Sequence, residues 1–251
     1  MVYGLLISRI YVKFMKAMTL KDNYSWRSSI DEGLQDAHTS GKPFFLFFCS
    51  ETCFYCHRMN MAVYPQQNVA DLIRGEFVPV RITPATPELF GIYAVNTVPA
   101  FIVSGTDGME CERHAGFLDA EALTSFCLLA LGKYYHDRRE IEKAQQYIER
   151  LIIAYPQSAY APEAVFLQGV YCYLTSHDPA CLKTSLFALA QNYPDSIWVR
   201  RSLILHCHPT TINEWEVYQR QHLDYWKSQD AYLKAYFTYY NGPSDHHIKG
   251  R

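Results

Sequence analysis

The chain carries little net charge, and it lacks a hydrophobic run long enough to cross a bilayer. Its 251 residues include 23 Lys and Arg against 25 Asp and Glu, a formal net charge of −2. Nucleic acids and anionic membranes bind clustered positive charge, so the composition argues against both as partners. Near the N-terminus, Arg9, Lys13 and Lys16 interrupt the apolar stretch at residues 2–7 before a segment of signal length develops. We therefore expect no leader and no membrane span, and we predict a cytoplasmic location.

The sequence also lacks the regular cysteine spacing of a disulfide framework. Apart from one cluster, its cysteines stand alone in apolar, helix-like sequence. An isolated cysteine on an apolar face is usually a small buried hydrophobe, which agrees with a reducing compartment. We therefore expect buried thiols outside the cluster. The eight cysteines are Cys49, Cys53, Cys56, Cys111, Cys127, Cys172, Cys181 and Cys207.

Helical and extended patterns alternate between residues 24 and 131. Helical spacing over residues 24–40, which includes Trp26, predicts a first helix that ends before Gly41 and Pro43. The unbroken apolar run at 44–49 predicts a strand that is buried on both faces. The further predicted elements are a helix over 56–75, a strand over 77–82, a loop with a short helix over 84–95, hairpin strands over 101–104 and 110–116 joined by Asp107-Gly108, and a helix capped by Asp119.

Two cysteines separated by two residues follow the buried run directly. Cys53 lies where the predicted strand gives way to a helix, and Cys56 lies one turn further along. Unpaired amides and the dipole at a helix N-terminus favour a thiolate over a thiol. Cys53 is therefore predicted to attack and Cys56 to resolve a mixed disulfide, because exchange proceeds by thiolate attack on a disulfide sulfur. Phe54 and Tyr55, between them, are candidate substrate-binding residues.

Three features of the sequence together resemble the thioredoxin fold. They are the Cys53/Cys56 pair, the Thr97-Val98-Pro99 segment that opens the next strand, and the Asp107-Gly108 turn followed by Gly116. The resemblance covers about residues 24–131 and implies a central mixed sheet flanked by helices. It also implies a cis Pro99 beside the cysteine pair and a Val98 backbone that binds an incoming substrate strand. The string Cys53-x-x-Cys56-His57-x-Met59, with Trp26 in the first predicted helix, is similar to the spermatogenesis-associated thioredoxin-like group.

The site departs from ordinary thioredoxin in its acid–base residues. Phe47 stands where that family often has a buried acid, six residues before Cys53. Glu51 is a candidate substitute base, although a loop carboxylate is more often simply solvated. His57 is a candidate tuning residue, because a nearby cation favours thiolate, and the alternative is a surface histidine. Cys49 is either a third redox sulfur or a core residue.

From residue 125 the pattern becomes helical throughout. Apolar and small residues, among them Gly132 and Ala144, follow the spacing of a tetratricopeptide repeat. Tyr155-Pro-Gln-Ser recurs at Tyr193 as Tyr-Pro-Asp-Ser, and a looser second unit contains Gly169. We predict an α/β thioredoxin fold followed by an all-α tetratricopeptide-like domain. The predicted divisions are a tail at 1–23, domains at 24–131 and 132–240, and a loose tail at 241–251. Met15 or Met18 in the first tail is a candidate true start. A long helix at 212–240 is expected to cap the repeats of the second domain.

Other chemistries can use the same residue types. Cys53 to His57 has the spacing of a c-type haem attachment motif, but no export signal accompanies it. Zinc would require a second, spaced ligand pair, which is lacking. In His206-Cys207-His208 the two histidines point to different sides of a helix, and His246-His247 lies in the tail. We therefore predict no metal and no cofactor.

Two functions remain as hypotheses. The first is a thiol–disulfide oxidoreductase that reduces protein disulfides through the Cys53/Cys56 dithiol, with the helical repeats selecting partners. Its partners would be a disulfide-bearing protein or peptide, a reductase, and a protein bound to the repeats. The second is a scaffold without enzymatic activity, in which the thioredoxin-like part is only a platform for protein interaction. The intact dithiol pattern favours the enzyme.

Overall fold

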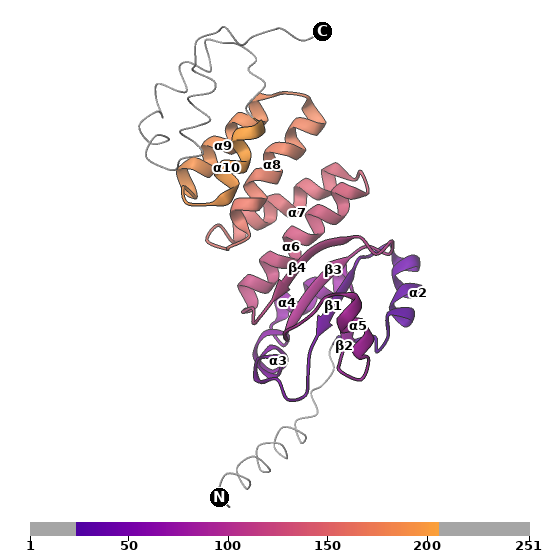
Figure 1. The fold of residues 1–251 in the computed structure, drawn as a ribbon. Coiled ribbons are helices and arrows are strands. Elements are labelled where there is room, and N and C mark those ends of the chain that lie inside the picture. Colours follow the sequence, from indigo (N-terminus) through magenta and orange to yellow (C-terminus); the bar gives the residue numbers. More distant parts are fainter. Residues whose placement is uncertain (1–23, 206–251) are drawn as a thin grey trace, which may run out of the picture. The chain divides into compact units, whose positions relative to one another are not determined.

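The computed structural model describes residues 24–205 of the chain (Figure 1). Strands and helices alternate in the first part, and the elements within residues 120–205 are all helices. In chain order the elements are α2 (Ile30–Ser40), β1 (Phe44–Phe48), α3 (Phe54–Arg58), a π-helical turn (Met59–Val63), α4 (Gln67–Glu76), β2 (Val78–Ile82), α5 (Pro87–Ile92), β3 (Ala100–Ser104), β4 (Glu110–Ala115), α6 (Ala120–Asp137), α7 (Ile141–Ala154), α8 (Ala161–Ser176), α9 (Ala180–Asn192) and α10 (Ile197–Leu205).

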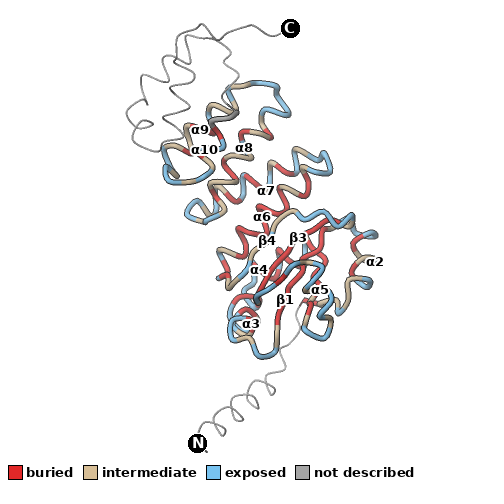
Figure 2. The backbone as a smooth tube through the Cα atoms, in the orientation of Figure 1, coloured by how far each residue is buried: buried red, intermediate tan, exposed pale blue. Residues whose placement is uncertain are grey.

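A mixed sheet of four strands forms the centre of the first part, in the order β2-β1-β3-β4. β1 pairs in parallel with β2 and antiparallel with β3, so that Leu46 lies opposite Val80 on one side and Ile102 on the other. Every residue of β1 is buried, as the unbroken apolar run predicts, because helices cover both faces of the sheet (Figure 2). The predicted thioredoxin fold with its mixed sheet is confirmed.

The two faces of the sheet bury different side chains, because successive residues of a strand point to opposite sides. On one face Phe44, Leu46 and Phe48 form a core with residues of α2 and α5. On the other face Phe45 and Phe47 lie in an aromatic cluster. Its ring contacts join Trp26, Tyr64, Phe77, Phe101 and Phe126.

The first helix begins later than predicted. Ser29 caps it, since its hydroxyl accepts a hydrogen bond from the Glu32 amide, and the Glu32 carboxylate accepts from the Ser28 amide in return. Trp26 is therefore not in this helix, and that prediction is wrong. Residues before the cap run alongside β2, where Arg27 bridges Val80, and Trp26 packs on the aromatic cluster.

The predicted helix over 56–75 is two helical segments. α3 continues through the π-helical turn at Met59–Val63, and the chain then leaves the helix at Tyr64 and Pro65 before α4 begins. Proline lacks an amide donor, which ends the helical hydrogen-bond ladder here. The hairpin between β3 and β4 is confirmed, with Gly108 at positive φ and a Gly105 amide that donates to Met109 O at 2.9 Å.

Helices α6 to α10 follow the sheet. Asp119 caps α6 as predicted, because its carboxylate accepts from the Ala122 amide at 2.9 Å. α6 and α7 approach closely at Gly132, where an added Cβ would lie 2.6 Å from Ile148 Cδ1. α8 and α9 repeat this arrangement at Gly169, where a Cβ would lie 2.4 Å from Ser185 Cβ. Small residues thus permit close helix contact in both pairs, as predicted for Gly132.

The two Tyr-Pro turns also share one geometry. Tyr155 ends α7 at φ −134° and ψ 53°, and Tyr193 ends α9 at φ −138° and ψ 54°. Each tyrosine amide donates to the carbonyl four residues earlier at 2.8 Å, and each tyrosine carbonyl accepts from a serine amide three residues later at 3.0 Å. The internal echo in the sequence therefore corresponds to a repeated turn between helices.

The chain forms two compact units that divide between Ala164 and Val165, inside α8. The predicted boundary after residue 131 lies within α6, and the division into 24–131 and 132–240 stays a prediction. The predicted tails at 1–23 and 241–251, and the predicted terminal helix at 212–240, lie outside the described residues. Within residues 24–205, no helix has both the length and the apolar character that a bilayer crossing requires.

Candidate functional site

Cys53 and Cys56 lie at the junction of β1 and α3. Cys53 is the N-cap of α3, and Cys56 lies in its first turn with a Cα–Cα separation of 5.2 Å. The two sulfurs form a disulfide, and the Cys56 amide points at Cys53 Sγ from 3.0 Å. Cys53 is half-buried and Cys56 is 1% exposed. An attacking reagent therefore reaches Cys53 first, and the amide beside its sulfur stabilises negative charge there.

The Val98–Pro99 segment lies against this pair. The peptide bond between the two residues is cis, and Pro99 is buried. The Val98 carbonyl oxygen lies 3.5 Å from Cys53 Sγ, and the Pro99 carbonyl accepts from the Gly116 amide at 2.8 Å. The start of β3 thus holds backbone polar groups next to the reactive sulfur.

Exposed aromatic side chains surround the disulfide. Phe54 is 58% exposed and Tyr55 is 51% exposed. The ring of Tyr55 lies 5.8 Å from that of Phe117, and the Arg58 guanidinium lies 4.7 Å from the Phe117 ring centroid. We call Phe54, Tyr55 and Phe117 the aromatic rim. Phe117 was missed from the sequence, although it directly follows Gly116, one of the residues that carry the resemblance to thioredoxin.

His57 and Glu51 are brought together by a main-chain contact. His57 Nε2 lies 2.7 Å from the Glu51 carbonyl oxygen, so the ring donates to the backbone. The Glu51 side chain is exposed. This contact ties the His57 ring, in α3, to the loop that precedes the helix.

Behind the pair, aromatic packing replaces an acid. Phe47 is fully buried and stacks on Phe101 at 5.5 Å, with the Tyr64 ring at 5.2 Å. Among residues 24–205, no Asp or Glu is buried, and Tyr64 Oη and Arg81 Nε have no hydrogen-bond partner there. Burial raises the pKa of Cys49 to about 11, and the charge of Arg81 acts in the opposite direction. Cys49 is therefore a neutral thiol at ordinary pH.

The remaining described cysteines are three free thiols and one bonded pair. Cys49 and Cys127 are buried free thiols, as predicted for isolated cysteines, whereas Cys111 is a free thiol that is only half-buried. Cys172 and Cys181, however, form a second disulfide and are half-buried, so the prediction of buried thiols is wrong for them. The turn between α8 and α9 brings them together, which their spacing in the sequence does not reveal. Cys207 lies outside the described residues.

The alternative chemistries gain no support from the site. Cys53 and Cys56 are bonded to each other, so their sulfurs are not free for a metal or a haem in this state. In the described part of the chain, no three His, Cys, Asp or Glu side chains converge as a metal site would require. The segments His206-Cys207-His208 and His246-His247 lie outside that part.

Residues 30–129 match the family model of the thioredoxin-like domain. The match spans less than half of the chain and agrees with the thioredoxin fold of this part. This match, together with the β1–α3 junction and the position of Pro99, confirms the predicted resemblance at the level of the superfamily. None of the curated proteins searched matches the chain.

Several solved structures are similar to the chain. A thioredoxin-fold protein from Helicobacter pylori is 20% identical over 53% of this chain and 99% of its own, with a TM-score of 0.37. A thioredoxin from Thermus thermophilus is 23% identical over 50% and 89%, with a TM-score of 0.35. The C-terminal domain of DsbD from Neisseria meningitidis, in its oxidised form, is 24% identical over 39% and 91%, with a TM-score of 0.33.

Proposed function

We propose that the chain is a thiol–disulfide oxidoreductase in which Cys53 attacks and Cys56 resolves. The observation that carries this proposal is the bonded pair at the start of α3, with the sulfur of Cys53 half-exposed and 3.5 Å from the Val98 carbonyl beside Pro99. A thioredoxin-like domain with a cysteine pair at disulfide distance is consistent with such exchange.

In the reducing direction, both cysteines begin as a dithiol. The Cys53 thiolate attacks a substrate disulfide, one substrate sulfur leaves and takes up a proton, and a mixed disulfide remains. Cys56 then loses its proton and attacks the Cys53 sulfur, which releases the second substrate sulfur. Two electrons pass to the substrate, and the Cys53–Cys56 disulfide is the product. The amide of Cys56 and the start of the helical segment stabilise the Cys53 thiolate.

Substrate binding is assigned to Phe54, Tyr55 and Val98, with Phe117 added from the structure. Exposed rings offer apolar surface to a polypeptide, and the backbone of Val98 next to Pro99 offers hydrogen-bonding groups to an extended segment. His57, in α3, and Glu51, in the loop before it, are assigned the tuning of the pair. A disulfide-bearing protein or peptide, and a reductase that restores the dithiol, are the partners this reaction requires.

The helical part is proposed to select partners through tetratricopeptide-like repeats at 132–240. The close contacts at Gly132 and Gly169 and the repeated Tyr-Pro turn support a repeating helix pair, and repeat solenoids present binding faces. The Cys56-His57-x-Met59 string supports a place near the spermatogenesis-associated thioredoxin-like group. A cytoplasmic location stays a prediction, and the Cys172–Cys181 disulfide favours an oxidising compartment instead.

A second candidate is the scaffold without enzymatic activity. The observation in its favour is Phe47, because a buried aromatic ring cannot accept the proton that a buried acid would take from the resolving cysteine. In this case the thioredoxin-like domain would act only as a platform for a partner protein.

Turnover of a protein disulfide distinguishes the two candidates. We expect Cys53→Ser to abolish disulfide reduction and Cys56→Ser to accumulate a covalent mixed disulfide that can be isolated and identified. Cys49→Ser is the matched control, since its buried thiol has a raised pKa and should not take part. Reduction that continues unchanged in Cys53→Ser would remove the enzyme and leave the scaffold.

A further inference from the structure

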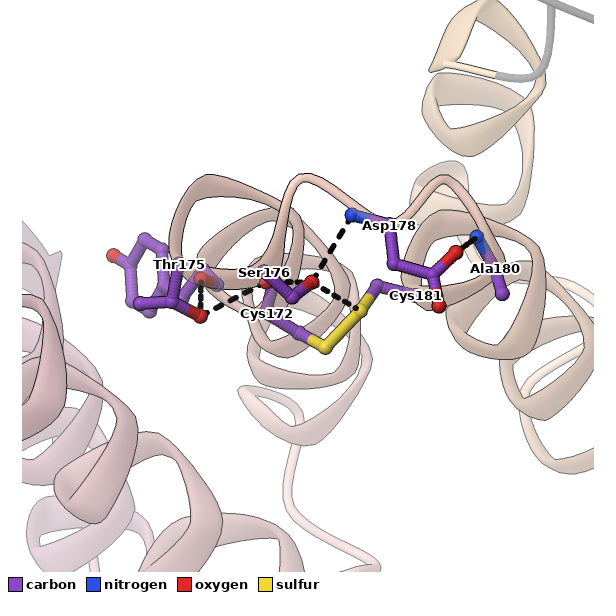
Figure 3. Close-up of a disulfide and its surroundings, with 7 residues drawn as sticks. Cys172, Thr175, Ser176, Asp178, Ala180 and Cys181 are labelled. Atoms are coloured by element: carbon purple, nitrogen blue, oxygen red, sulfur yellow. Dashed lines mark hydrogen bonds between the residues drawn. A yellow bond between two sulfur atoms is a disulfide. The ribbon is translucent and has the colours of Figure 1, made fainter. Parts of the chain in front are cut away.

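A second cysteine pair lies in the helical part, far along the sequence from the first. Cys172 lies four residues before the end of α8 and Cys181 is the second residue of α9, so their disulfide crosses the turn between these helices (Figure 3). Their Cα atoms are 5.7 Å apart. The proposed oxidoreductase function of Cys53 and Cys56 makes no use of this pair.

The helix pair is held together by contacts other than the disulfide. The two helices pack closely at Gly169. A Cβ added to this glycine would lie 2.4 Å from Ser185 Cβ and 3.2 Å from the Cys181 carbonyl oxygen. Ser185 Oγ also donates a hydrogen bond to Val165 O, from α9 to α8. Because these contacts do not involve the sulfurs, both redox states can share one backbone arrangement.

The turn itself is also hydrogen-bonded without the sulfurs. The His177 amide donates to Tyr173 O at 2.8 Å, and the Cys181 amide donates to Asp178 O at 3.1 Å. The Asp178 amide donates to Ser176 Oγ at 3.1 Å (Figure 3). The loop that the disulfide closes is short, so the bond gives less entropic stabilisation than one that closes a long loop. Opening the bond therefore leaves the turn intact and the sulfurs close enough to bond again.

The pair is accessible, and its two sulfurs differ. Both cysteines are half-buried, and residues 173–178 beside them are exposed. Cys181 lies at the start of α9, and Ser176 Oγ lies 3.5 Å from its sulfur (Figure 3). In the disulfide form this hydroxyl donates to Cys172 O at 2.8 Å, and it can rotate to donate to a Cys181 thiolate when the bond opens. The Asp178 carboxylate, which accepts from the Ala180 amide at 2.8 Å, acts in the opposite direction. The Ser176 contact makes Cys181 the better leaving sulfur.

We propose that Cys172 and Cys181 form a second redox-active pair, which is reduced by a dithiol. A thiolate of the dithiol attacks Cys172 Sγ, the bond between the two cysteines breaks, and Cys181 leaves as a thiolate that takes a proton from water. The second sulfur of the dithiol then attacks the first and releases Cys172, which is also protonated. The pair gains two electrons and two protons, and the dithiol becomes a disulfide. Dithiols of the Cys-x-x-Cys class are the co-reactant that this chemistry fits.

Differential alkylation of the full-length, natively folded chain tests this proposal. The protein is held in millimolar reduced dithiothreitol or in millimolar oxidised glutathione, its free thiols are capped, and peptide mapping then reports the two pairs separately. We expect Cys172 and Cys181 to become thiols within minutes in the reduced reagent and to bond again in the oxidised reagent, with an unchanged circular dichroism spectrum. The same behaviour is expected in Cys53→Ser/Cys56→Ser, so the result does not depend on the first pair.

Ser176→Ala provides the matched variant. Loss of a hydrogen bond to the leaving thiolate should slow reduction of this pair by about two- to tenfold while leaving reduction of Cys53–Cys56 unchanged. A pair that stays oxidised until the protein is unfolded in guanidinium would overturn the proposal and make the bond a structural staple. Thiols that remain free in the oxidised reagent would overturn it as well.

Discussion

Tyr64 follows the helical segment that carries the first cysteine pair, and its ring packs on Phe47. This tyrosine is 3% exposed, and its hydroxyl finds no partner among the described residues. A buried hydroxyl without a hydrogen-bond partner destabilises the folded protein relative to a phenylalanine ring at the same position. Tyr64 thus adds aromatic packing to the site, whereas its hydroxyl adds no stability of its own.

Tyr64→Phe should accordingly leave the free energy of unfolding within about 0.5 kcal/mol of the wild type or raise it. Tyr24→Phe is the matched control, because the Tyr24 hydroxyl donates to the Tyr64 carbonyl and its removal should cost about 1 kcal/mol. Urea unfolding of the three proteins provides the comparison. A loss above about 1 kcal/mol in Tyr64→Phe would show that its hydroxyl is hydrogen-bonded in solution.

At the scale of residues, the sequence predicts what depends on close neighbours. Cys53 and Cys56 were found because a strand, a helix start and their spacing are all local features. Phe117 is missed by the sequence analysis, because its contacts with Tyr55 and Arg58 depend on the fold bringing the segment after β4 to α3. The contact of His57 with the Glu51 carbonyl was missed for a similar reason, since a side-chain pattern does not reveal a main-chain acceptor.

At the scale of elements, α6 and α7 show how a single small residue sets the distance between helices. An alanine at Gly132 would bring its Cβ within 2.6 Å of Ile148 Cδ1 and 2.7 Å of its Cγ1. Real atoms do not approach so closely, so either the Ile148 side chain or the helices must move. The fully buried Ile148 has little room to do so.

Gly132→Ala should therefore destabilise the protein by about 1–3 kcal/mol. Gly75→Ala in α4 is the matched control, because an added Cβ there meets no atom within 4 Å. Alanine is the better helix former, and the control should gain about 0.5–1 kcal/mol. Thermal unfolding reports both variants, and equal stability of the two would contradict the close packing of α6 on α7.

The elements were predicted well where one pattern runs without interruption. β1 is an unbroken apolar run, and α6 carries its own cap at Asp119. The predicted first helix begins too early, because Trp26 fits the helical spacing. In the structure, the Ser29 cap sets the start of the helix. The sequence predicts a continuous helix at 56–75, because the residue pattern is helical over most of this range. In the structure, the π-helical turn and the break at Pro65 interrupt it.

At the scale of the whole molecule, titration of buried thiols links stability to pH. Burial raises the pKa of Cys49 to about 11, whereas a thiol in the unfolded chain has a pKa of about 8.5. Between these values the unfolded chain loses the proton while the folded protein keeps it. The free energy of unfolding must then fall as the pH rises above about 8.5, and the loss is complete above the folded pKa.

Between pH 8 and pH 10 we expect Cys49 alone to lower the free energy of unfolding by about 1–2 kcal/mol. Cys49→Ala lacks this titration, so its stability should fall less steeply over the same range. Denaturant unfolding at several pH values compares the two proteins. Parallel pH profiles would show that Cys49 titrates alike in the folded and unfolded states.

The overall organisation was only partly accessible from the sequence. The prediction of a thioredoxin fold followed by helices is confirmed, because local sequence patterns indicate the order of the elements. The Cys172–Cys181 disulfide was not predicted, because it depends on the packing of α8 against α9. The units divide inside α8, where no change in composition marks a boundary.

The pKa of the Cys53 thiol in the reduced protein decides whether this sulfur is an activated nucleophile. Alkylation with iodoacetamide across pH, followed by peptide mapping, reports it, because only the thiolate reacts. We predict a Cys53 pKa well below the ordinary value of about 8.5, with Cys49 in the same sample unreactive until far higher pH. A Cys53 that titrates at about 8.5 or above would contradict an activated nucleophile at the start of α3.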